Sequence, residues 1–222
     1  MPNVRLLHFK TKEELAASIT PLFASQGEVI PWIWYDTPGT AAAPSYTSGT
    51  TTQLDFFQTV QPDKTRGNMQ AAGQIPAPMY FDLYHMSFYI ATPPSALAIA
   101  ATLTPSTGAL NDVHGLILGS VSLQIAQKSY FESKVYMCPA GGGINPFASI
   151  AGTFAATNLQ AVQYAQNGNP DPRSRNNFWG GITIPHNQNF LVRCNWAAAL
   201  TLAAGNTDIN CYLDGYLYRR VL

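Results

Sequence analysis

The side chains that most often form catalytic centres are few in this sequence and widely spaced. Its four histidines are isolated, without the His-x-His or His-x-x-x-His spacing that brings two ligands to one metal: His8, His85, His114 and His186. His85 lies in an aromatic run, where a hydrogen-bonded histidine on a strand is the simpler interpretation. No Gly-x-Ser-x-Gly nucleophile motif, Gly-x-Gly-x-x-Gly motif or Walker loop occurs. We therefore expect no metal, no cofactor and no enzymatic activity.

Two aspartates have the residue type needed for acid–base chemistry. Asp55 and Asp82 both fall on segments predicted to be strands, and they would be the acid and base of a glycosidase if they faced one cleft. Nothing in the sequence fixes their separation. Asp82 stands among aromatic residues, and we favour a position on the solvent face of its strand.

A glycine run and a polar segment have the composition of ion-binding loops. The glycines at 141–143 lack the Lys and Ser/Thr of a phosphate-binding loop, so a flexible turn or a tight backbone contact is the better interpretation. Asn167, Asn169 and Asp171 repeat with the spacing of the first ligands of a calcium loop. Because only one of the three is a carboxylate, we favour a turn-rich surface loop and keep calcium binding as the alternative.

The tyrosines near the C-terminus predict a binding surface of one of two kinds. Tyr212, Tyr216 and Tyr218 lie on the polar side of an alternating segment, so they share one face of a strand. Such a row can stack against sugar rings, or it can form a subunit interface, where tyrosine is enriched. Arg173 and Arg175 are most simply solubilising charges, although they are also able to pair across a subunit contact.

Charge is the unusual feature of the composition. Asp, Glu, Lys and Arg make up 11% of the 222 residues, and the 12 positive and 12 negative charges cancel. A typical soluble domain has about 25%. A chain without an overall basic field is not expected to bind nucleic acid generally, and zero net charge favours association. The remaining charges gather at the N-terminal arm, at residues 167–177 and at Arg219 and Arg220, where we expect contacts with partners.

Residues 1–27 are predicted to form an arm followed by a short helix. Thr11 and Glu14 have the spacing of a capping box, and apolar residues follow on one helical face. The arm before the helix carries the densest basic run of the chain, at Arg5, Lys10 and Lys12. These charges suit an anionic lipid or nucleic-acid surface, and a solvated terminal segment explains them equally well. We expect neither a membrane helix nor a secretory signal.

Residues 28–222 are predicted to form one all-β domain, a single antiparallel jelly-roll sandwich of about eight strands with long loops. Period-two patterning and β-branched or aromatic composition predict strands over residues 29–35, 50–61, 79–92, 116–127, 130–138, 181–185, 190–200 and 209–220. Helices are expected over 95–103 and 158–165. Cys194 and Cys211 occupy apolar positions, and three cysteines do not suggest a disulfide framework.

Three stretches of the sequence carry a family resemblance. They are the Asn68-Met69 pair leading through Gly73-Gln74-Ile75-Pro76-Ala77-Pro78 into a long strand, the hairpin of residues 116–143 around Lys128-Ser129-Tyr130-Phe131-Glu132 that closes in Pro139-Ala140-Gly141-Gly142-Gly143, and the C-terminal Leu213-Asp214-Gly215-Tyr216-Leu217-Tyr218-Arg219-Arg220-Val221. Together they make up about a quarter of the chain. The sequence thereby resembles the jelly-roll major capsid proteins of small tailless icosahedral bacteriophages, including those with an internal membrane.

The resemblance implies a structural virion protein, a self-assembling subunit of an icosahedral capsid shell. Its partners would be other copies of itself in capsomers and a closed shell, other virion proteins, and an internal membrane or the packaged genome beneath the inward-facing arm. It would be assembled in the host cytoplasm and reside in the virion, with one barrel per chain. The inner-surface contacts would be Arg5, Lys10 and Lys12, and the subunit contacts Arg173, Arg175, Tyr216, Tyr218, Arg219 and Arg220. The alternative is a jelly-roll carbohydrate-binding module or a receptor-binding virion spike.

Overall fold

The computed structural model describes residues 27–40, 42–93, 95–98, 108–151, 160–168 and 176–220. Apart from Gly27, the predicted N-terminal arm and helix lie outside these residues. The same holds for five of the residues expected to make contacts: Arg5, Lys10, Lys12, Arg173 and Arg175.

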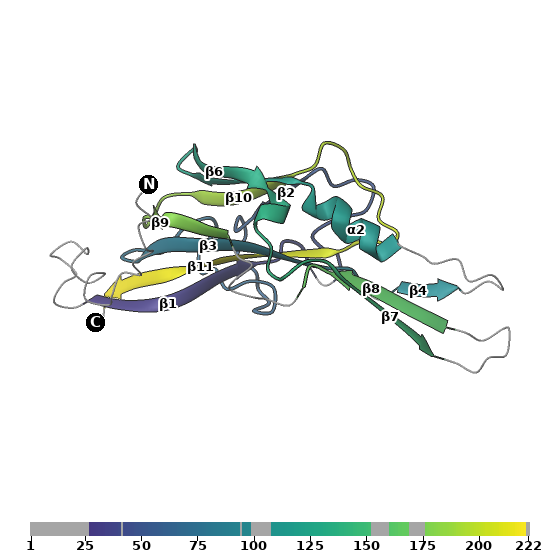
Figure 1. Ribbon diagram of the computed structural model, residues 1–222. Helices are drawn as coiled ribbons and strands as arrows, with labels where there is room; N and C mark the ends of the chain where they lie inside the picture. Colours follow the sequence, from purple (N-terminus) through teal and green to yellow (C-terminus); the bar gives the residue numbers. More distant parts are fainter. Residues whose placement is uncertain are drawn as a thin grey trace, which may run out of the picture.

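Two antiparallel sheets form the body of the molecule and lie one above the other (Figure 1). The smaller sheet has four strands in the order β2 (Gln53–Phe56), β10 (Phe190–Asn195), β5 (Ser120–Ile125) and β6 (Lys128–Lys134). The larger has seven, of which β1 (Gly27–Asp36), β11 (Asp208–Arg220), β3 (Tyr80–Ala91) and β9 (Asn176–Ile184) face the smaller sheet. An antiparallel two-sheet β-fold is therefore confirmed.

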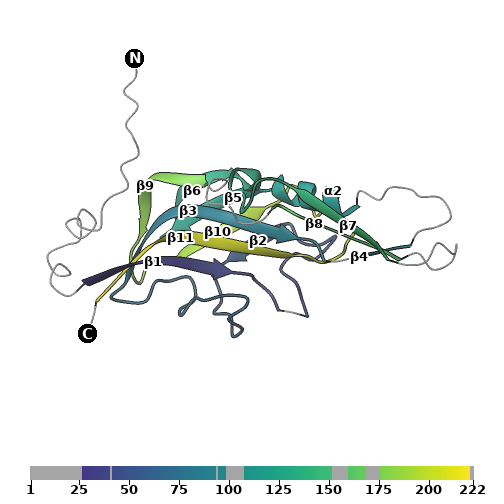
Figure 2. The same cartoon turned by 60° about the horizontal axis from the view of Figure 1, so that its bottom comes forward.

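The remaining three strands of the larger sheet continue beyond this body. They are β4 (Ser95–Ala98), β8 (Gln160–Gln166) and β7 (Asn145–Ala151), with β8 in the middle. Helix α2 (Gly108–Ile117) packs against β7 and β8, and a 3-10 turn, η1 (Val135–Met137), follows β6. Figures 1 and 2 both show β4, β8 and β7 extending away from the two-sheet body.

Period-two burial explains why the body strands form and where the core lies. Along β10 and β5, every second residue is buried, and within the sheet Val192 lies opposite Leu123 and Cys194 opposite Val121. The large sheet contributes aromatic and aliphatic side chains from β3 and β11, among them Phe81, Phe88, Ile90, Cys211 and Leu213. All three cysteines are free and buried, so the predicted apolar positions of Cys194 and Cys211 are confirmed.

The two helices predicted within the domain are wrong wherever the structure describes them. Residues 95–98 of the first form strand β4, and residues 160–165 of the second lie in strand β8. These alanine- and glutamine-rich segments are strands because they pair with one another, Ser95 opposite Gln163 and Ala98 opposite Gln160. Such pairing partners, far apart in sequence, override local helix propensity.

Several predicted strand boundaries also need correction. The strand expected over 116–127 begins only at Ser120, because residues up to Ile117 belong to α2. The strand expected over 50–61 is limited to Gln53–Phe56, since Phe57 adopts a left-handed φ of 66° that ends it. Instead of about eight strands, the described residues hold eleven. No helix among them is long and apolar enough to cross a membrane.

Candidate functional site

The outer surface of the large sheet carries a row of aromatic and aliphatic side chains that we call the tyrosine face. Trp34 of β1 and Leu213 and Leu217 of β11 point into the core, so the residues between them point outward. Figure 2 shows β1, β11 and β3 side by side. The tyrosine face comprises Val29, Pro31, Ile33, Tyr35, Tyr80, Tyr84, Tyr212, Tyr216 and Tyr218.

Ring contacts between neighbouring strands order this face. The rings of Tyr84 and Tyr216 meet edge to face with centroids 5.7 Å apart, and those of Tyr35 and Tyr212 lie 6.4 Å apart. Each such pair contributes about 0.5–1.5 kcal/mol beyond the area it buries. Ile33 remains 45% exposed beside them. The structure thus presents an ordered row of rings at Tyr216, whereas Tyr218 on the same side of β11 is buried, at 6% exposed.

Asp82 is the acidic residue closest to these rings, and it lies on the outer face of β3 as predicted. Its Oδ1 accepts a hydrogen bond of 2.6 Å from the Thr183 hydroxyl. Burial, together with the nearby Asp82 carboxylate, raises the pKa of Tyr84 and holds that of Tyr218 far above its ordinary value. Both phenols therefore stay neutral at physiological pH, and the face gains no charge from its tyrosines.

An ion pair lies near one end of the β1–β11 pair, on the side of the sheet opposite to the tyrosine face. Arg219 Nε lies 2.9 Å from Glu28 Oε2, with the two side chains 48% and 36% exposed. An exposed pair of this kind contributes at most about 1 kcal/mol to stability. The backbone of Arg220 pairs with Gly27 at the start of β1. Of the predicted subunit contacts, Tyr216 and Tyr218 share the outward side of β11, whereas Arg219, two residues after the inward Leu217, lies on the other side of the strand.

Asp55 lies on the other sheet, so the structure does not bring it together with Asp82. It sits on β2 between the inward-facing Leu54 and Phe56 and points away from the core. Its carboxylate accepts two hydrogen bonds from Arg193, of 2.7 and 2.9 Å. Because Asp55 and Asp82 lie on the outer sides of different sheets with the core between them, they cannot act on one glycosidic bond, and the glycosidase alternative that the sequence left open does not hold for this pair.

Among the described residues, neither the histidines nor Asn167 of the segment considered for calcium belongs to a metal site. No three His, Cys, Asp or Glu side chains in the described ranges are grouped so as to hold a metal ion. Asn167 is buried: its Nδ2 donates to the Phe88 carbonyl at 2.5 Å, and its Oδ1 accepts the Ile90 N–H at 3.1 Å. Its amide thus fastens the end of β8 to β3. Asn169 and Asp171 lie outside the described residues.

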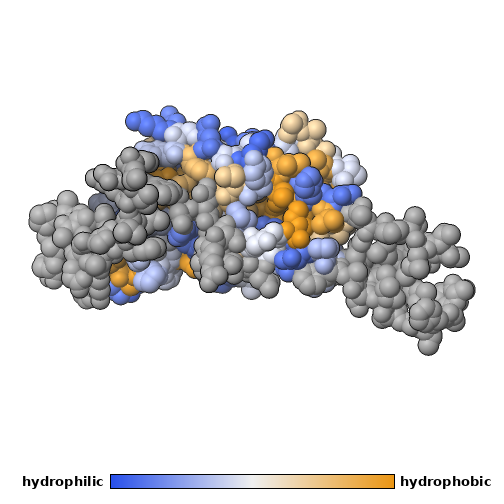
Figure 3. Space-filling view, viewed as in Figure 1, coloured by the Kyte–Doolittle hydropathy of each residue, from blue (hydrophilic) through white to orange (hydrophobic). Residues whose placement is uncertain are grey.

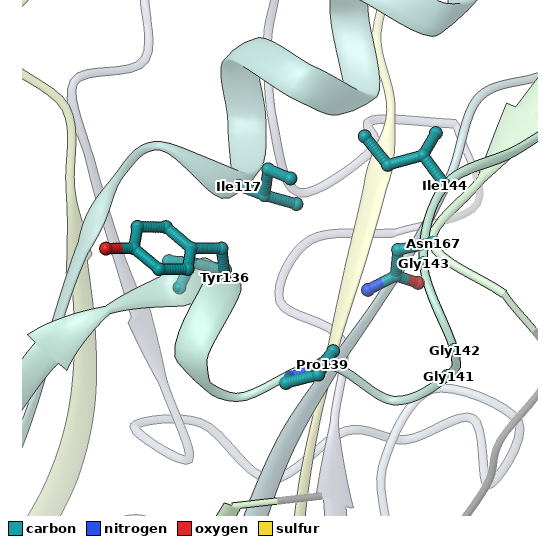
Figure 4. A pocket seen from close by; sticks show the side chains of 9 residues that line it. Ile117, Tyr136, Pro139, Gly141, Gly142, Gly143, Ile144 and Asn167 are labelled. Atoms are coloured by element: carbon teal, nitrogen blue, oxygen red, sulfur yellow. The ribbon is translucent and has the colours of Figure 1, made fainter. Parts of the chain in front are cut away.

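A hollow of about 300 Å³ lies where α2, η1 and the base of β7 meet (Figure 4). Ile117 and Ile144 lie on either side of it in Figure 4. Its lining holds no charged side chain: Ile117, Val135, Tyr136, Pro139, Gly141, Gly142, Gly143, Ile144 and Asn167. We define its rim as the lining residue Tyr136 together with Leu118 and Met137, which directly follow the lining residues Ile117 and Tyr136 in sequence; each of the three is about half exposed. Figure 3 shows apolar residues gathered near α2 on this face.

The glycine run at 141–143 forms one wall of this hollow through close backbone contact. Gly168, with φ of 90°, packs so closely that a Cβ there would lie 2.9 Å from Gly142 N and 3.0 Å from Gly143 O. The predicted tight backbone contact is therefore confirmed. Sequence reasoning missed the hollow itself, although the absence of charge around it was visible in the sequence.

A second missed residue is Asp36, a buried acid at the end of β1. Only 1% of it is exposed, and its Oδ2 accepts the Phe57 N–H at 2.5 Å. Burial raises the pKa of this carboxyl above its ordinary value of 3.8, against the opposing effect of its hydrogen bonds. Its inward parity after Trp32 and Trp34 was the signal in the sequence.

We expect the stability of the protein to depend on the ionisation of Asp36. Because the folded-state pKa is the higher one, protonated Asp36 stabilises the fold fully below about pH 3.8, and this contribution is lost as the pH rises through the folded-state pKa. Urea unfolding of the wild type and of Asp36→Asn between pH 4 and pH 7.5 measures this. The wild type should lose stability relative to the variant as the pH rises, and parallel pH profiles would contradict the expectation.

Comparison of the chain with protein-family models, with curated proteins and with solved structures finds no match.

Proposed function

We propose that this chain is a jelly-roll subunit of an icosahedral virion shell, a structural protein that assembles with copies of itself. The order of the body strands carries the proposal. Without β4, β7 and β8, the eight remaining strands pair first with eighth (β1–β11), second with seventh (β2–β10), third with sixth (β3–β9) and fourth with fifth (β5–β6). This is the pairing of one long hairpin rolled into two sheets, which is how a jelly roll is built.

The surface of the body supports assembly as the role of this fold. Interface cores are depleted in charged residues and enriched in tyrosine, because a desolvated unpaired charge is costly. The tyrosine face is enriched in tyrosine and carries the two acids Asp82 and Asp214, whereas the outer face of the small sheet carries the Asp55–Arg193 ion pair and the charged residues of β6. With 11% charged residues overall, the chain has the composition expected of a subunit whose surface is largely buried against other copies.

We also propose partners for this subunit and a location in the virion. Other virion proteins would contact the shell, and the basic N-terminal arm with Arg5, Lys10 and Lys12 would face an enclosed genome or membrane. Assembly would take place in the host cytoplasm, and the protein would reside in the virion.

Light scattering after size exclusion, together with negative-stain microscopy, tests the shell proposal. We expect capsomers or closed shells of the wild type as the protein concentration rises. A chain that stays monomeric at high concentration across salt and pH would contradict the proposal.

The tyrosine face makes a specific prediction for this assembly. Ile33→Glu places a carboxylate on the tyrosine face directly opposite Asp214, and burying it unpaired in a subunit contact costs several kcal/mol. We expect the concentration needed for assembly to rise at least about tenfold, the equivalent of about 1.4 kcal/mol, with unfolding unchanged because Ile33 is 45% exposed. Tyr130→Glu is the matched control, on β6 of the other sheet and 52% exposed. Equal effects of both variants would show that the tyrosine face has no special part.

A carbohydrate-binding module or receptor-binding spike is the second candidate. The observation in its favour is the exposed side of the Tyr84–Tyr216 pair next to Asp82, since aromatic rings beside a carboxylate suit a sugar. This function predicts a small fixed oligomer and saturable binding of glycans on an array, lost in Tyr216→Ala. A silent array, or binding unaffected by that substitution, removes it.

A further inference from the structure

The three strands β4, β8 and β7 form an arm that projects from the body of the molecule. Two insertions build it, one between β3 and β5 and the other between β6 and β9. β8 pairs with β4 on one side and β7 on the other, and its ladder to the body is limited to Gln166 opposite Ala91. We call these three strands the β-arm (Figures 1 and 2).

Most of each insertion is free of Asp, Glu, Lys, Arg and His; the exceptions are Asp112 and His114 in α2, and Asp171, Arg173 and Arg175 before β9. Residues 92–111 and 135–170 contain none of the 24 charged residues of the chain and none of its four histidines. At the frequency of charged residues found in the whole chain, about six would be expected in these two stretches. A projecting element gains solubility from charge, so a projection without any is expected to be covered in the working assembly.

The outer edge of β4 gives a second reason to expect a covering partner. Within the described residues, β4 pairs with β8 alone. Natural proteins protect an exposed edge strand with charges or proline, because its free N–H and C=O groups recruit other strands. The four residues Ser95–Ala98 have neither, and Pro93 and Pro94 directly before them protect the start of the edge alone.

The hollow between α2, η1 and β7 is the matching surface. Its lining has no charge, and Leu118, Tyr136 and Met137 are 50%, 49% and 50% exposed at its rim. The rim is held as one unit, because the Val135 N–H donates to the Gly119 carbonyl at 2.9 Å and so ties η1 to the turn after α2. Three large apolar side chains, each half exposed on a fixed frame, form a patch that is typical of a contact site.

A β-arm cannot reach the hollow of its own chain. Asn167, which lines the hollow, directly follows β8, so the hollow lies at the base of the arm. The seven residues of β8 place the far end of the arm about 23 Å from that base, at about 3.3 Å per residue. An extended strand does not fold back on itself, so an arm that fills a hollow belongs to another molecule.

We propose that the β-arm of one copy of this chain docks on the hollow and rim of a second copy. The match is one of composition, an uncharged projection against an uncharged depression, and it deepens the proposed shell function, on which it rests. Since arm and hollow are different surfaces, the contact is heterologous: each copy gives an arm and receives one. Repeated under rotation, such a contact closes rings and cages of identical subunits.

Photo-crosslinking from the rim tests the docking directly. A benzophenone amino acid replaces Met137 in the full chain, and the protein is mixed with an isotopically labelled copy so that links between copies are told apart from links within one. We expect links between copies that map to residues 95–98 or 145–166. Links to residues 1–26, to the body strands or to another protein, or no links between copies, would overturn the inference. The same probe at Tyr130, on β6, is the control and should not reach the β-arm.

A substitution gives a second measurement that does not depend on the probe. Leu118→Lys and Met137→Lys each place a charge on the rim, and both side chains are half exposed, so the fold should be unaffected. We expect each to raise the concentration for assembly at least about tenfold, whereas unchanged assembly by both would count against the docking.

The two proposals fail in different ways. Closed shells in the micrographs with rim links that avoid the β-arm would overturn the docking and leave the shell function standing. Arm-to-rim links in a small oligomer that never closes would support the docking and contradict the shell. A persistent monomer without links between copies would overturn both.

Discussion

Replacing Gly215 by alanine is expected to lower the free energy of unfolding by about 3–5 kcal/mol. Gly215 lies on β11 where the pairing with β3 shifts register, and it faces Leu83 while Asp214 faces His85. A Cβ at this position would lie 1.9 Å from the Asp82 carbonyl oxygen and 2.9 Å from its carbonyl carbon. Both are backbone atoms in the middle of the large sheet, so relief requires the β3–β11 ladder to move apart.

Gly115→Ala is the matched control for that substitution. Gly115 lies on α2, and the nearest atom to an added Cβ is Leu200 Cδ1 at 3.3 Å, the end of a flexible side chain. Alanine gains up to about 1 kcal/mol over glycine inside a helix, so this variant should be neutral or more stable. Urea unfolding of the two variants and the wild type decides the matter. If the free energy of unfolding of Gly215→Ala is within about 1 kcal/mol of the wild-type value, the strands are able to rearrange at the register shift between Asp214 and Gly215.

The same substitution links the fold to the tyrosine face. Tyr216 follows Gly215 directly, and its ring contacts Tyr84, the residue that β3 holds out of register with β11. If this register shift sets the angle between the Tyr84 and Tyr216 rings, Gly215→Ala should also impair assembly at temperatures where the variant is still folded. The Gly115→Ala control should assemble like the wild type.

Period-two patterning predicted the parts of the fold in which one face of a strand is buried and the other is not. β3, β10 and β11 have this pattern, and the inward positions of Cys194 and Cys211 and the outward position of Asp82 are all confirmed. In these strands the polarity of each residue indicates whether it faces the core or the solvent, so the strands can be predicted from a single sequence.

The β-arm could not be predicted in this way. Its strands carry alanine, serine and glutamine without alternation, and in an isolated sequence such segments favour a helix. They are strands because β8 finds β4 and β7, about 65 and 15 residues away along the chain. The same dependence on distant partners hid which sheet Asp55 and Asp82 belong to, and so whether they could share a cleft.

Gly215 and Asp36 were invisible for a related reason. The sequence shows a glycine in an alternating strand, but the contact that requires it is the Asp82 carbonyl on another strand. Asp36 meets the Phe57 N–H across a loop that the strand pattern does not describe. When a residue is required because of one backbone atom on a distant segment, the hydrophobic periodicity of its own segment does not reveal it.

Asn167→Ala is expected to destabilise the protein by about 2–4 kcal/mol, because the buried side chain makes two hydrogen bonds to β3. The Ile90 N–H would lose its bond to Oδ1 inside the protein, which accounts for most of the loss. The Phe88 carbonyl would lose one of two donors and keep the Ala140 N–H at 3.1 Å. Asn189→Ala is the control: its Oδ1 accepts an exposed bond from Gln74, and its removal should cost less than about 1 kcal/mol.

Asn167→Asp separates this structural role from calcium binding. The aspartate keeps an acceptor for the Ile90 N–H but loses the donor to Phe88, and it buries a charge, so we expect a larger loss of stability at pH 7 than at pH 4. A calcium ligand would behave in the opposite way, since a second carboxylate beside Asp171 would tighten the site and millimolar calcium would restore stability. Stability curves of the wild type and both Asn167 variants with and without calcium distinguish the two. Because the Asn167 amide is already bonded to β3, we expect calcium to leave the stability of the wild type and of both Asn167 variants unchanged. In the two variants, the attachment of β8 to β3 is weakened, so we expect the β-arm to unfold before the body.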